Sequence, residues 1–427
     1  MIDVQRLYDV IVIGAGPSGS STGIAASRMG LSTVILEAGG KGRDKYCGGG
    51  LSLLSQRTLR EVGAREALEA IEVYAEGHVL ALPGGRLLVD ILPEGAHGLV
   101  RRSIFDAKLQ EVSESLGADV RYNFKAVGIS VEKEKVVVKS SKGETAEGRY
   151  LVIASGVSDK LADALGFPPR PAKEFLGHCW GTEAPYPVEE EAARWRQKYG
   201  ITPIFLMFGF VTYGYMWVFP KKSHMNVGMG TTLKESAKYG KKHIEGYNEG
   251  LKLAAKLGIL SKPDLFKVDR GWLIPGKPRA RTYSVKKRTL LVGDAAGFVH
   301  PLTGEGISGA LRSGWIAANV VKEALDREDP SFLATYQEKW WRDFGEEAFK
   351  YGARLTQIMY THPLLQKLSL EMVFSDEKAT KLLSSLLGRT DPTATRKLYS
   401  YVLRHFPELL VRRAVTKERI KSYSKEG

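Results

Sequence analysis

Cysteine is scarce in this chain of 427 residues, which contains only Cys47 and Cys179. Two cysteines exclude a small fold that depends on several disulfides, and their positions lack the spacing of a metal site, so we expect no bound metal. The sequence also lacks a signal peptide, because the first apolar run begins almost at the N-terminus. These absences predict a cytoplasmic protein, with peripheral contact on the inner face of the membrane as an alternative.

The sequence has no clear transmembrane helix either. The stretch ITPIFLMFGFVTYGYMWVFP, residues 201–220, has the length of a membrane span and no charged side chain over 20 residues. However, it contains Pro203, Gly209 and Gly214, and its large apolar side chains alternate with a period of two. This pattern favours two strands that face a dry cavity over a helix that crosses a bilayer.

Acidic residues are outnumbered, with 48 Asp and Glu against 62 Lys and Arg and a net charge of +14. We expect no nucleic-acid partner, because no basic run is interleaved with aromatic residues and no nucleic-acid module is recognisable. An anionic membrane surface or an anionic substrate or redox partner is favoured instead. The tail from Thr393 to Gly427 has nine Lys or Arg and three Glu, so it is either a basic amphipathic helix on lipid headgroups or a solvated helix.

The stretch from Tyr8 to Glu37 has the pattern of a dinucleotide-binding βαβ unit. A β-branched strand leads into the turn Gly14, Ala15, Gly16, Pro17, Ser18 and Gly19, which opens a helix. Gly14 permits the tight turn, Gly16 lets the backbone approach a pyrophosphate, and Gly19 allows the helix to pack closely on the strand. The second strand ends at Glu37, whose carboxylate can accept hydrogen bonds from ribose hydroxyls. The fingerprint itself leaves FAD or NAD open, and its N-terminal position favours FAD.

A second motif follows another short apolar strand and ends at Gly293 and Asp294. An acid at this position can bond the ribityl hydroxyls of a flavin. The backbone of Gly304, Gly306 and Ile307 opens the next helix, where amides could stabilise negative charge on a reduced ring. The alternative is an ordinary strand–loop–helix connection.

Tyr215, Trp217 and Phe219 lie on one face if residues 215–219 form a strand. Such an aromatic row could line an apolar slot, although aromatic rows are more often ordinary core packing.

Together these motifs resemble the FAD-dependent oxidoreductases of the glutathione-reductase-like superfamily, and more narrowly the geranylgeranyl reductase family, which includes archaeal digeranylgeranylglycerophospholipid reductases. The narrower resemblance depends on Tyr46–Gly50, where the family has a Cys-Gly motif, and on Tyr215–Pro220 followed by Gly228-Met229-Gly230. It extends over about residues 8–330 and is weak or absent beyond them.

The resemblance implies a set of FAD-binding residues. They are Gly14, Ala15, Gly16, Pro17, Ser18, Gly19, Glu37, Ala38, Cys47, Gly48, Gly50, Arg102, Val127, Asp294, Gly304, Gly306 and Ile307. Cys47 is either a cofactor contact, a catalytic acid or redox group, or half of a disulfide with Cys179. Arg102 could instead belong to a solvated pair with Arg101. A general-base role for His300 is weaker than a structural one.

The implied fold is an α/β protein with a Rossmann-like FAD-binding domain of the glutathione-reductase or p-hydroxybenzoate-hydroxylase type. We expect this domain at residues 1–72, 97–165 and 285–330, an inserted antiparallel β-rich substrate domain at 73–96 and 166–284, and a helical region at 331–427.

The implied activity is FAD-dependent reduction of isolated C=C bonds in geranylgeranyl chains of archaeal-type membrane lipids or their precursors, with Tyr215, Trp217 and Phe219 as substrate contacts. A flavin-dependent monooxygenase, a quinone-prenyl reductase and a non-catalytic prenyl-binding escort are the alternatives. Gly297 stands where related monooxygenases often have histidine, which disfavours hydroxylation. A second complete GxGxxG unit is missing, so the electron donor, NADPH or ferredoxin, stays open.

Overall fold

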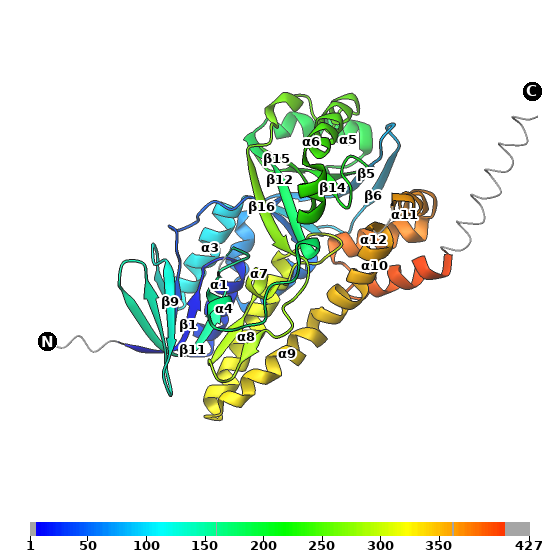
Figure 1. Cartoon of the computed structure of the whole chain (residues 1–427). Helices are drawn as coiled ribbons and strands as arrows, with labels where there is room; N and C mark the ends of the chain where they lie inside the picture. The colour runs from blue at the N-terminus through cyan, green and yellow to red at the C-terminus, as the bar shows by residue number, and fades with distance from the viewer. Residues whose placement is uncertain (1–5, 159, 361–362, 406–427) are drawn as a thin grey trace, which may run out of the picture.

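The computed structural model describes residues 6–158, 160–360 and 363–405. Two large sheets and a helical region lie side by side, with the first sheet near the N-terminus and the helical region toward the C-terminus (Figure 1). Residues 406–427, which carry most of the basic tail considered above, lie outside the described part of the chain, whereas residues 394–405 are helical.

The first sheet has eight strands and is built around the dinucleotide fingerprint. Its main order is β17-β18-β11-β1-β2-β8, with β9 and β10 attached to β11 as an antiparallel extension. The strands are β1 (Leu7–Ile13), β2 (Thr33–Leu36), β8 (Asp119–Arg121), β9 (Ala126–Val131), β10 (Val136–Ser140), β11 (Thr145–Ile153), β17 (Tyr283–Ser284) and β18 (Thr289–Leu291). β1 pairs in parallel with β2 and β11, and its apolar residues are buried on both faces, as in doubly covered parallel sheets.

Helices pack against this sheet and against one another. They are α1 (Pro17–Arg28), α3 (Arg102–Ser115), α7 (Gly293–Ala296) and α8 (Ile307–Asp326), with the short α4 (Leu161–Ala164) nearby. α1 and α8 approach closely because small residues meet at their crossing. A Cβ atom on Gly314 of α8 would lie 2.3 Å from the carbonyl oxygen of Ser18. α3 begins at Arg102, and Arg101 is its N-cap.

The second sheet has seven strands in the order β16-β12-β15-β14-β13-β5-β6. They are β5 (Gly77–Ala81), β6 (Leu87–Ile91), β12 (Leu176–Pro185), β13 (Pro203–Phe208), β14 (Tyr215–Pro220), β15 (His224–Thr232) and β16 (Arg270–Pro275). All its pairs are antiparallel except β5 with β13, which are parallel because the chain leaves this sheet between them. The sheet was expected to be antiparallel, but it is mixed, because one of its strand pairs is parallel.

The uncharged stretch 201–220 forms β13 and β14, so the prediction of two strands is confirmed. Within residues 6–158, 160–360 and 363–405, no helix combines the length and apolarity that a bilayer crossing requires. One face of the second sheet, including Phe205 and Met216, packs against α5 (Val188–Tyr199) and α6 (Leu233–Lys256). The opposite face, including Leu206 and Trp217, packs toward the C-terminal helices.

A three-stranded sheet lies between the two large ones. It consists of β3 (Gly50–Ser52), β7 (His97–Val100) and β4 (Ile71–Ala75), and α2 (Leu53–Val62) follows β3 directly. Short 3₁₀ turns occur at Arg65–Ala70, Lys173–Phe175, Pro263–Leu265 and Pro330–Ala334. Strands of the first large sheet thus come from residues 7–36, 119–153 and 283–291, and those of the second from 77–91 and 176–275. We propose the discontinuous domain division on this basis.

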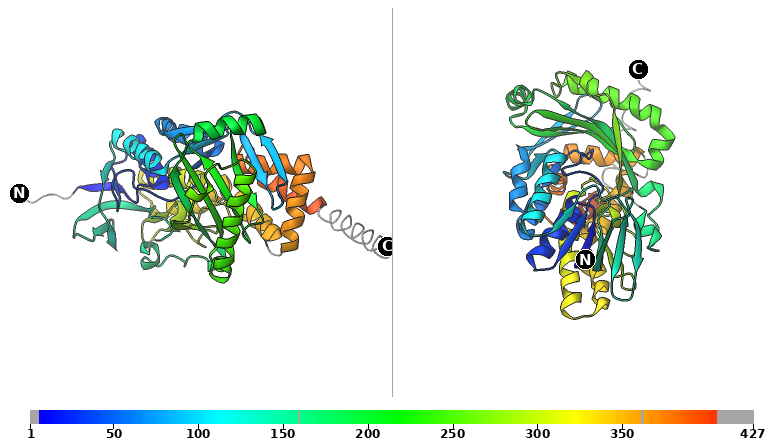
Figure 2. Two further views of the ribbon diagram at one scale, coloured as in Figure 1. Left: turned by 90° about the horizontal axis from the view of Figure 1, so that it is seen from above. Right: turned by 90° about the vertical axis from the view of Figure 1, so that its left-hand side faces the viewer.

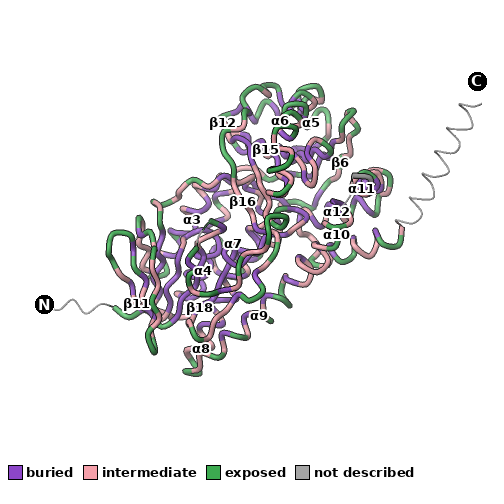
Figure 3. The backbone as a smooth tube through the Cα atoms, in the orientation of Figure 1, coloured by how far each residue is buried: buried purple, intermediate pink, exposed green. Residues whose placement is uncertain are grey.

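The C-terminal region begins as one long rod, drawn yellow to orange in Figure 1. The rod comprises α9 (Thr335–Trp340), a π-helical turn region (Trp341–Gly352) and α10 (Ala353–Tyr360), and it is followed by α11 (Pro363–Ser375) and α12 (Glu377–Gly388). Figure 2 shows the same rod and helices from two further sides. Buried backbone is concentrated in the first sheet and around α7 and α8 (Figure 3).

The glycine at the α1–α8 crossing gives a test of the packing. We expect Gly314→Ala to lower the free energy of unfolding by about 2 kcal/mol, because the added methyl overlaps the backbone of α1. Gly240→Ala in α6 is the matched control. Nothing lies within 4 Å of the Cβ position there, so it should change stability by less than about 0.5 kcal/mol. Chemical denaturation of both variants measures the difference, and equal stabilities would contradict this account.

Candidate active site

One cavity of about 1530 Å³ lies between the first sheet, the inner face of the second sheet and the C-terminal helices. Ordinary ligand pockets measure about 300–1000 Å³, so this one has room for a cofactor together with a substrate. Ile13, Leu36 and Ala154 line it, and each lies at or just after the carboxyl end of a parallel strand. This is the edge at which open α/β sheets bind ligands.

The three glycines of the fingerprint are required for different reasons. Gly14 has a φ of +100°, and a Cβ atom there would lie 2.6 Å from the carbonyl oxygen of Ala154. A Cβ atom on Gly19 would lie 1.7 Å from the carbonyl oxygen of Gly14, so the helix could not pack against the turn. At Gly16 the nearest atom would be Nη2 of Arg43 at 3.5 Å, and Gly16 lines the cavity. Gly14 and Gly19 are therefore required by packing within the protein, whereas the absence of a side chain at Gly16 leaves space for a ligand.

The N-terminus of α1 has the properties of an anion site. It has Gly16 as N-cap, Pro17 at its first position, no capping side chain and no acidic residue in its first turn. The N-terminal amides and the helix dipole thus face the cavity without a competing carboxylate. Pro17 and Ser18 line the cavity at this point.

Glu37 is buried, and its carboxylate binds the turn as well as facing the cavity. It accepts hydrogen bonds from the amide of Ala15 (2.7 Å), the amide of Gly39 (2.8 Å) and Nε of Arg43 (3.0 Å). An ionised carboxylate has about four acceptor positions, so one position is left for a ribose hydroxyl. Ala38 lines the cavity next to it.

Val127, which the resemblance implies as an FAD contact, lies one residue outside the cavity wall. Val127 lies in β9, is 52% exposed and does not line the cavity. Phe124, Lys125 and Ala126 line it instead. Ala15 and Gly19 also do not line it, since Ala15 acts through Glu37 and Gly19 through packing. The other residues expected to bind cofactor or substrate all line this one cavity.

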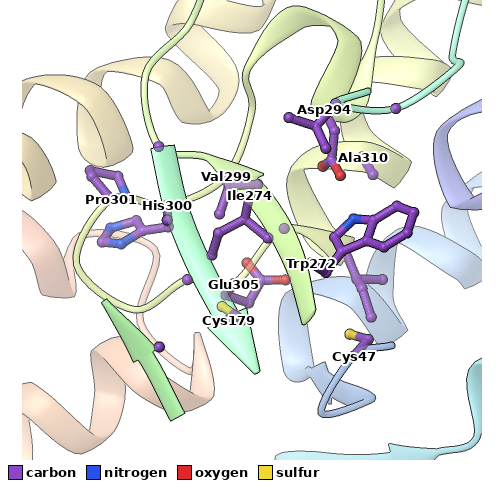
Figure 4. A pocket seen from close by; sticks show the side chains of 18 of the residues that line it. Cys47, Cys179, Trp272, Ile274, Asp294, Val299, His300, Pro301, Glu305 and Ala310 are labelled. Carbon is purple, nitrogen blue, oxygen red and sulfur yellow. The ribbon is translucent and has the colours of Figure 1, made fainter. Parts of the chain in front are cut away.

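Asp294 follows β18 and lies in α7, at the other end of the cofactor set. Its carboxylate accepts from Nζ of Lys45 at 3.1 Å, and that ammonium lies 5.4 Å from the ring centre of Trp272. Figure 4 shows Asp294 and Cys47 with the indole of Trp272 between them in this view. Lys45 and Trp272 were not expected from the sequence, and the cavity gathers them from distant segments.

The turn from Gly304 to Ile307 leads into α8, and the Glu305 carboxylate accepts hydrogen bonds at the N-terminus of this helix. The Glu305 carboxylate accepts from the amide (2.7 Å) and the hydroxyl (2.5 Å) of Ser308 and lies 3.8 Å from Nε of Arg389. Arg389 comes from the residues after α12, so this ion pair joins the turn to the C-terminal region. Gly304 and Gly306 line the cavity through their backbone.

His300 lies in the loop before this turn and is buried. Its Nδ1 accepts from the amide of Thr303 at 3.3 Å, and burial lowers the pKa of the imidazole well below its usual value. A neutral histidine that holds its own loop agrees with the structural interpretation.

Arg102 is buried in the cavity wall, whereas Arg101 is partly exposed and pairs with Glu72. The Arg102 guanidinium binds both oxygens of Asp106, at 2.9 and 2.8 Å. Burial alone would lower its pKa, but its interactions with Asp106 and, to a smaller extent, Cys47 raise it above the usual value. Arg102 is therefore a fixed cation beside Cys47 and not part of a solvated pair.

Cys47 and Cys179 are both free thiols that line the cavity. The Sγ atom of Cys47 accepts from the amide of Gly49 at 3.4 Å. Burial, and to a smaller extent the interaction with Cys47, raises the pKa of Cys179 to about 12. Cys179 is thus held as a neutral thiol, and the structure contains no disulfide between the two.

Tyr215, Trp217 and Phe219, here called the aromatic wall, lie on β14 and line the cavity. The register of β14 and β15 places them opposite Gly230, Gly228 and Asn226. A Cβ atom on Gly228 would lie 2.5 Å from Cζ2 of Trp217. The Gly-x-Gly pattern therefore leaves room for the rings, which explains why the two parts of the signature occur together.

The C-terminal helices close the cavity opposite the aromatic wall. Ala353, Thr356 and Tyr360 of α10 and Leu387 of α12 line it, and Leu355 and Met359 pack in one apolar cluster with Trp217. Sequence reasoning missed this wall, because helical periodicity alone does not show which surface a helix covers.

The residues fit FAD at this site. Gly16 is open toward the cavity, an uncapped helix N-terminus faces it, and acids stand at Glu37 and Asp294. Tyr46 to Gly50 continue the lining from the nucleotide end toward the aromatic wall.

Comparisons with known proteins agree with the family and the fold expected from the sequence. A family model described as pyridine nucleotide-disulphide oxidoreductase matches residues 8–180. Digeranylgeranylglycerophospholipid reductase 1 of Methanopyrus kandleri is 32% identical over 82% of this chain and 90% of its own length. The digeranylgeranylglycerophospholipid reductase of Methanocaldococcus jannaschii is 28% identical over 96% of this chain and 98% of its own length. The similarity thus continues beyond residue 330, where the sequence analysis expected it to end.

A solved structure shows the same fold. The geranylgeranyl bacteriochlorophyll reductase-like protein of Thermoplasma acidophilum superposes with a TM-score of 0.75 and 21% identity, covering 96% of this chain and 98% of that chain. The FAD-binding fold class expected from the sequence is therefore confirmed, including its helical C-terminal region.

Two glycine variants separate ligand space from protein packing. We expect Gly16→Ala to leave the stability of the apoprotein within about 0.5 kcal/mol and to weaken FAD binding roughly tenfold or more, because its methyl enters the ligand's space. Gly19→Ala should lower the free energy of unfolding by about 2–3 kcal/mol. Denaturation and FAD titration check both, and a destabilised Gly16→Ala with normal FAD affinity would contradict this assignment.

Proposed function

The chain belongs to the family of digeranylgeranylglycerophospholipid reductases, and we propose that it is an FAD-dependent reductase of isolated C=C bonds in geranylgeranyl chains. The observation that carries this proposal is that a single cavity joins the dinucleotide turn after β1 to the aromatic wall on β14. The substrates would be archaeal-type membrane lipids or their precursors, because their long apolar chains suit the space between the second sheet and α10.

The cofactor would be held at two ends. The turn 14–19 and Glu37 would take the nucleotide, whereas Asp294 and the backbone at Gly304, Gly306 and Ile307 would face the flavin end. Once bound and reduced, FAD supplies hydride chemistry. The protein contributes orientation and the exclusion of water, because it fixes the alkene against one side of the cofactor space.

The aromatic wall would stabilise the reacting alkene. An isolated trisubstituted alkene is not electrophilic, so its reduction builds positive charge on carbon. The faces of Tyr215, Trp217 and Phe219 attract positive charge and exclude water from the cavity. The hydroxyl of Tyr215 donates to the carbonyl of Thr303 at 2.5 Å, which fixes its ring next to the turn before α8.

Cys47 would supply the proton. Saturation of one alkene requires a hydride at one carbon and a proton at the other, and the thiol of Cys47 lines the cavity between the nucleotide turn and the aromatic wall. The resulting thiolate would lie beside the fixed cation of Arg102 and regain its proton from solvent. Burial raises the pKa values of Cys179 and Tyr215, so both are held neutral.

The electron donor would be NADPH or ferredoxin. No second dinucleotide-binding unit occurs among the described strands and helices, so the donor would reach the flavin through the same cavity or at its rim. The basic net charge favours an acidic partner or an anionic membrane surface at which lipid substrates are met.

Mass spectrometry of lipids tests the proposed reaction. Anaerobic enzyme reduced with dithionite and incubated with a geranylgeranyl glycerophospholipid should add two hydrogens for each alkene that is saturated. We expect Cys47→Ser to bind FAD and to lower kcat roughly 100-fold to 10,000-fold, because the general acid is lost. Cys179→Ser is the matched thiol control and should lose less than tenfold.

Other products would identify the alternatives. Unchanged prenyl lipids in every assay overturn the reductase assignment, and oxygen consumption with a hydroxylated product would identify a monooxygenase. Purified protein without the visible absorption of an oxidised flavin would favour a prenyl-binding escort.

A further inference from the structure

Three consecutive residues before Gly49 are bound by the β14–β15 hairpin. We call residues 46–49 the Cys47 loop. The hydroxyl of Tyr46 donates to the carbonyl of Val227 at 3.4 Å. The side-chain nitrogen Nδ2 of Asn226 donates to the carbonyl of Cys47 at 3.2 Å, and Nζ of Lys221 donates to the carbonyl of Gly48. The loop is thus held to the second sheet along its length, although it follows a strand of the first sheet.

The side chain of Asn226 is buried and uses all its strong hydrogen-bonding groups. Its oxygen accepts from Nε1 of Trp217 at 2.7 Å, and its nitrogen donates to Cys47 and to the carboxylate of Glu183 at 3.0 Å. Because an indole N–H can only donate and a carboxylate can only accept, the amide orientation is fixed. Asn226 therefore connects the central ring of the aromatic wall to the backbone of Cys47.

Lys221 is fully buried beneath the same loop. Its ammonium lies 5.8 Å from the ring centre of Phe219 as well as at the carbonyl of Gly48. Burial lowers its pKa to about 8; Glu183, Cys47 and Glu72 oppose this shift, and Arg101 adds to it. A buried lysine is costly to stability, so its presence at this position indicates a use other than packing.

We propose that Lys221 and Asn226 are positioning residues that hold the Cys47 loop against the aromatic wall, so that the Cys47 thiol and Trp217 keep one fixed separation. The proposal rests on the proposed function only in naming these two groups as the proton donor and the substrate wall. Their hydrogen bonds reach backbone carbonyls of the loop and not its side chains. They therefore fix where the thiol lies without contacting the substrate.

Thiol alkylation measures the position of the loop without turnover. In a Cys179→Ser background, Cys47 is the only thiol, and its reaction with iodoacetamide reports how freely the loop moves. We expect alkylation of Lys221→Met and Asn226→Leu apoprotein to be roughly tenfold faster, because the loop loses an anchor. Lys222→Met is the matched control, since Lys222 is adjacent and exposed, and its rate should equal that of the parent.

Steady-state kinetics then separates positioning from binding. Both variants should lower kcat roughly tenfold to 100-fold and change KM less than threefold, because the apolar slot is intact. If either variant fails to fold, Asn226→Ser takes its place in the test. The shorter serine side chain cannot hydrogen-bond to Trp217 and to the carbonyl of Cys47 at the same time.

Two results would overturn the proposal, namely alkylation rates equal to that of Lys222→Met or a rise in KM alone. Faster alkylation in a protein whose parent saturates no prenyl lipid would support the anchored loop and reject the reductase function, so the two failures are distinguishable.

The pH dependence of stability gives a second test of Lys221. Its pKa is about 8 when folded and 10.5 when unfolded, so between these values the unfolded chain binds more protons and the stability of the wild type rises with pH. Below pH 8 the folded protein bears the cost of a buried ammonium. We expect Lys221→Met to melt about 2 °C higher than wild type at pH 7, with the difference narrowing above pH 8. A lower melting temperature at pH 7 would show that the lysine is retained for stability and would overturn its positioning role.

Discussion

The structure depends on the close approach of backbone where the Cys47 loop meets the second sheet. Gly49 has a φ of +72°, and a Cβ atom there would lie 2.0 Å from the carbonyl oxygen of Val100. A Cβ atom on Gly48 would lie 2.8 Å from the ring of Phe219, and one on Gly228 would lie 2.3 Å from the hydroxyl of Tyr46. Side chains at Gly48 and Gly228 would push the loop away from the second sheet, and one at Gly49 would push it away from β7 of the three-stranded sheet.

Charges in the cavity and next to it are arranged in two ways. Most are paired at once, as when Arg102 binds Asp106 or Glu37 accepts from Arg43 and two amides. Paired charges of this kind lose little by burial, because their hydrogen bonds replace those of water. Lys221 differs, since it is fully buried and binds a neutral carbonyl. The buried ammonium of Lys221 therefore lowers the stability of the fold at the point where it holds the Cys47 loop, which carries the candidate proton donor.

The C-terminal helices form part of the site. Tyr360 and Thr356 line the cavity, and the pair of Glu305 with Arg389 ties the turn before α8 to the residues after α12. The Glu305 carboxylate is thus satisfied by a helix N-terminus and a cation. Under the proposed function, a substrate chain bound against the aromatic wall would also touch α10, and this region would share in selecting the substrate.

The sequence by itself determined the elements whose patterns are local. The fingerprint around Gly14 to Gly19, the two strands within 201–220 and the alternation of Tyr215 with Trp217 follow from spacing along the chain, because a turn, a strand period or a helix start involves only neighbouring residues. Family resemblance added the flavin and the prenyl substrate.

Tertiary structure alone decided which distant residues meet. It put Phe124 to Ala126 at the wall in place of Val127, closed the cavity with α10 and brought Lys221 and Asn226 to the Cys47 loop. Such contacts join segments more than 170 residues apart, since Lys221 and Gly48 are separated by 173 positions. No local pattern of charge or apolar spacing encodes that distance, because it is set by how the two sheets pack.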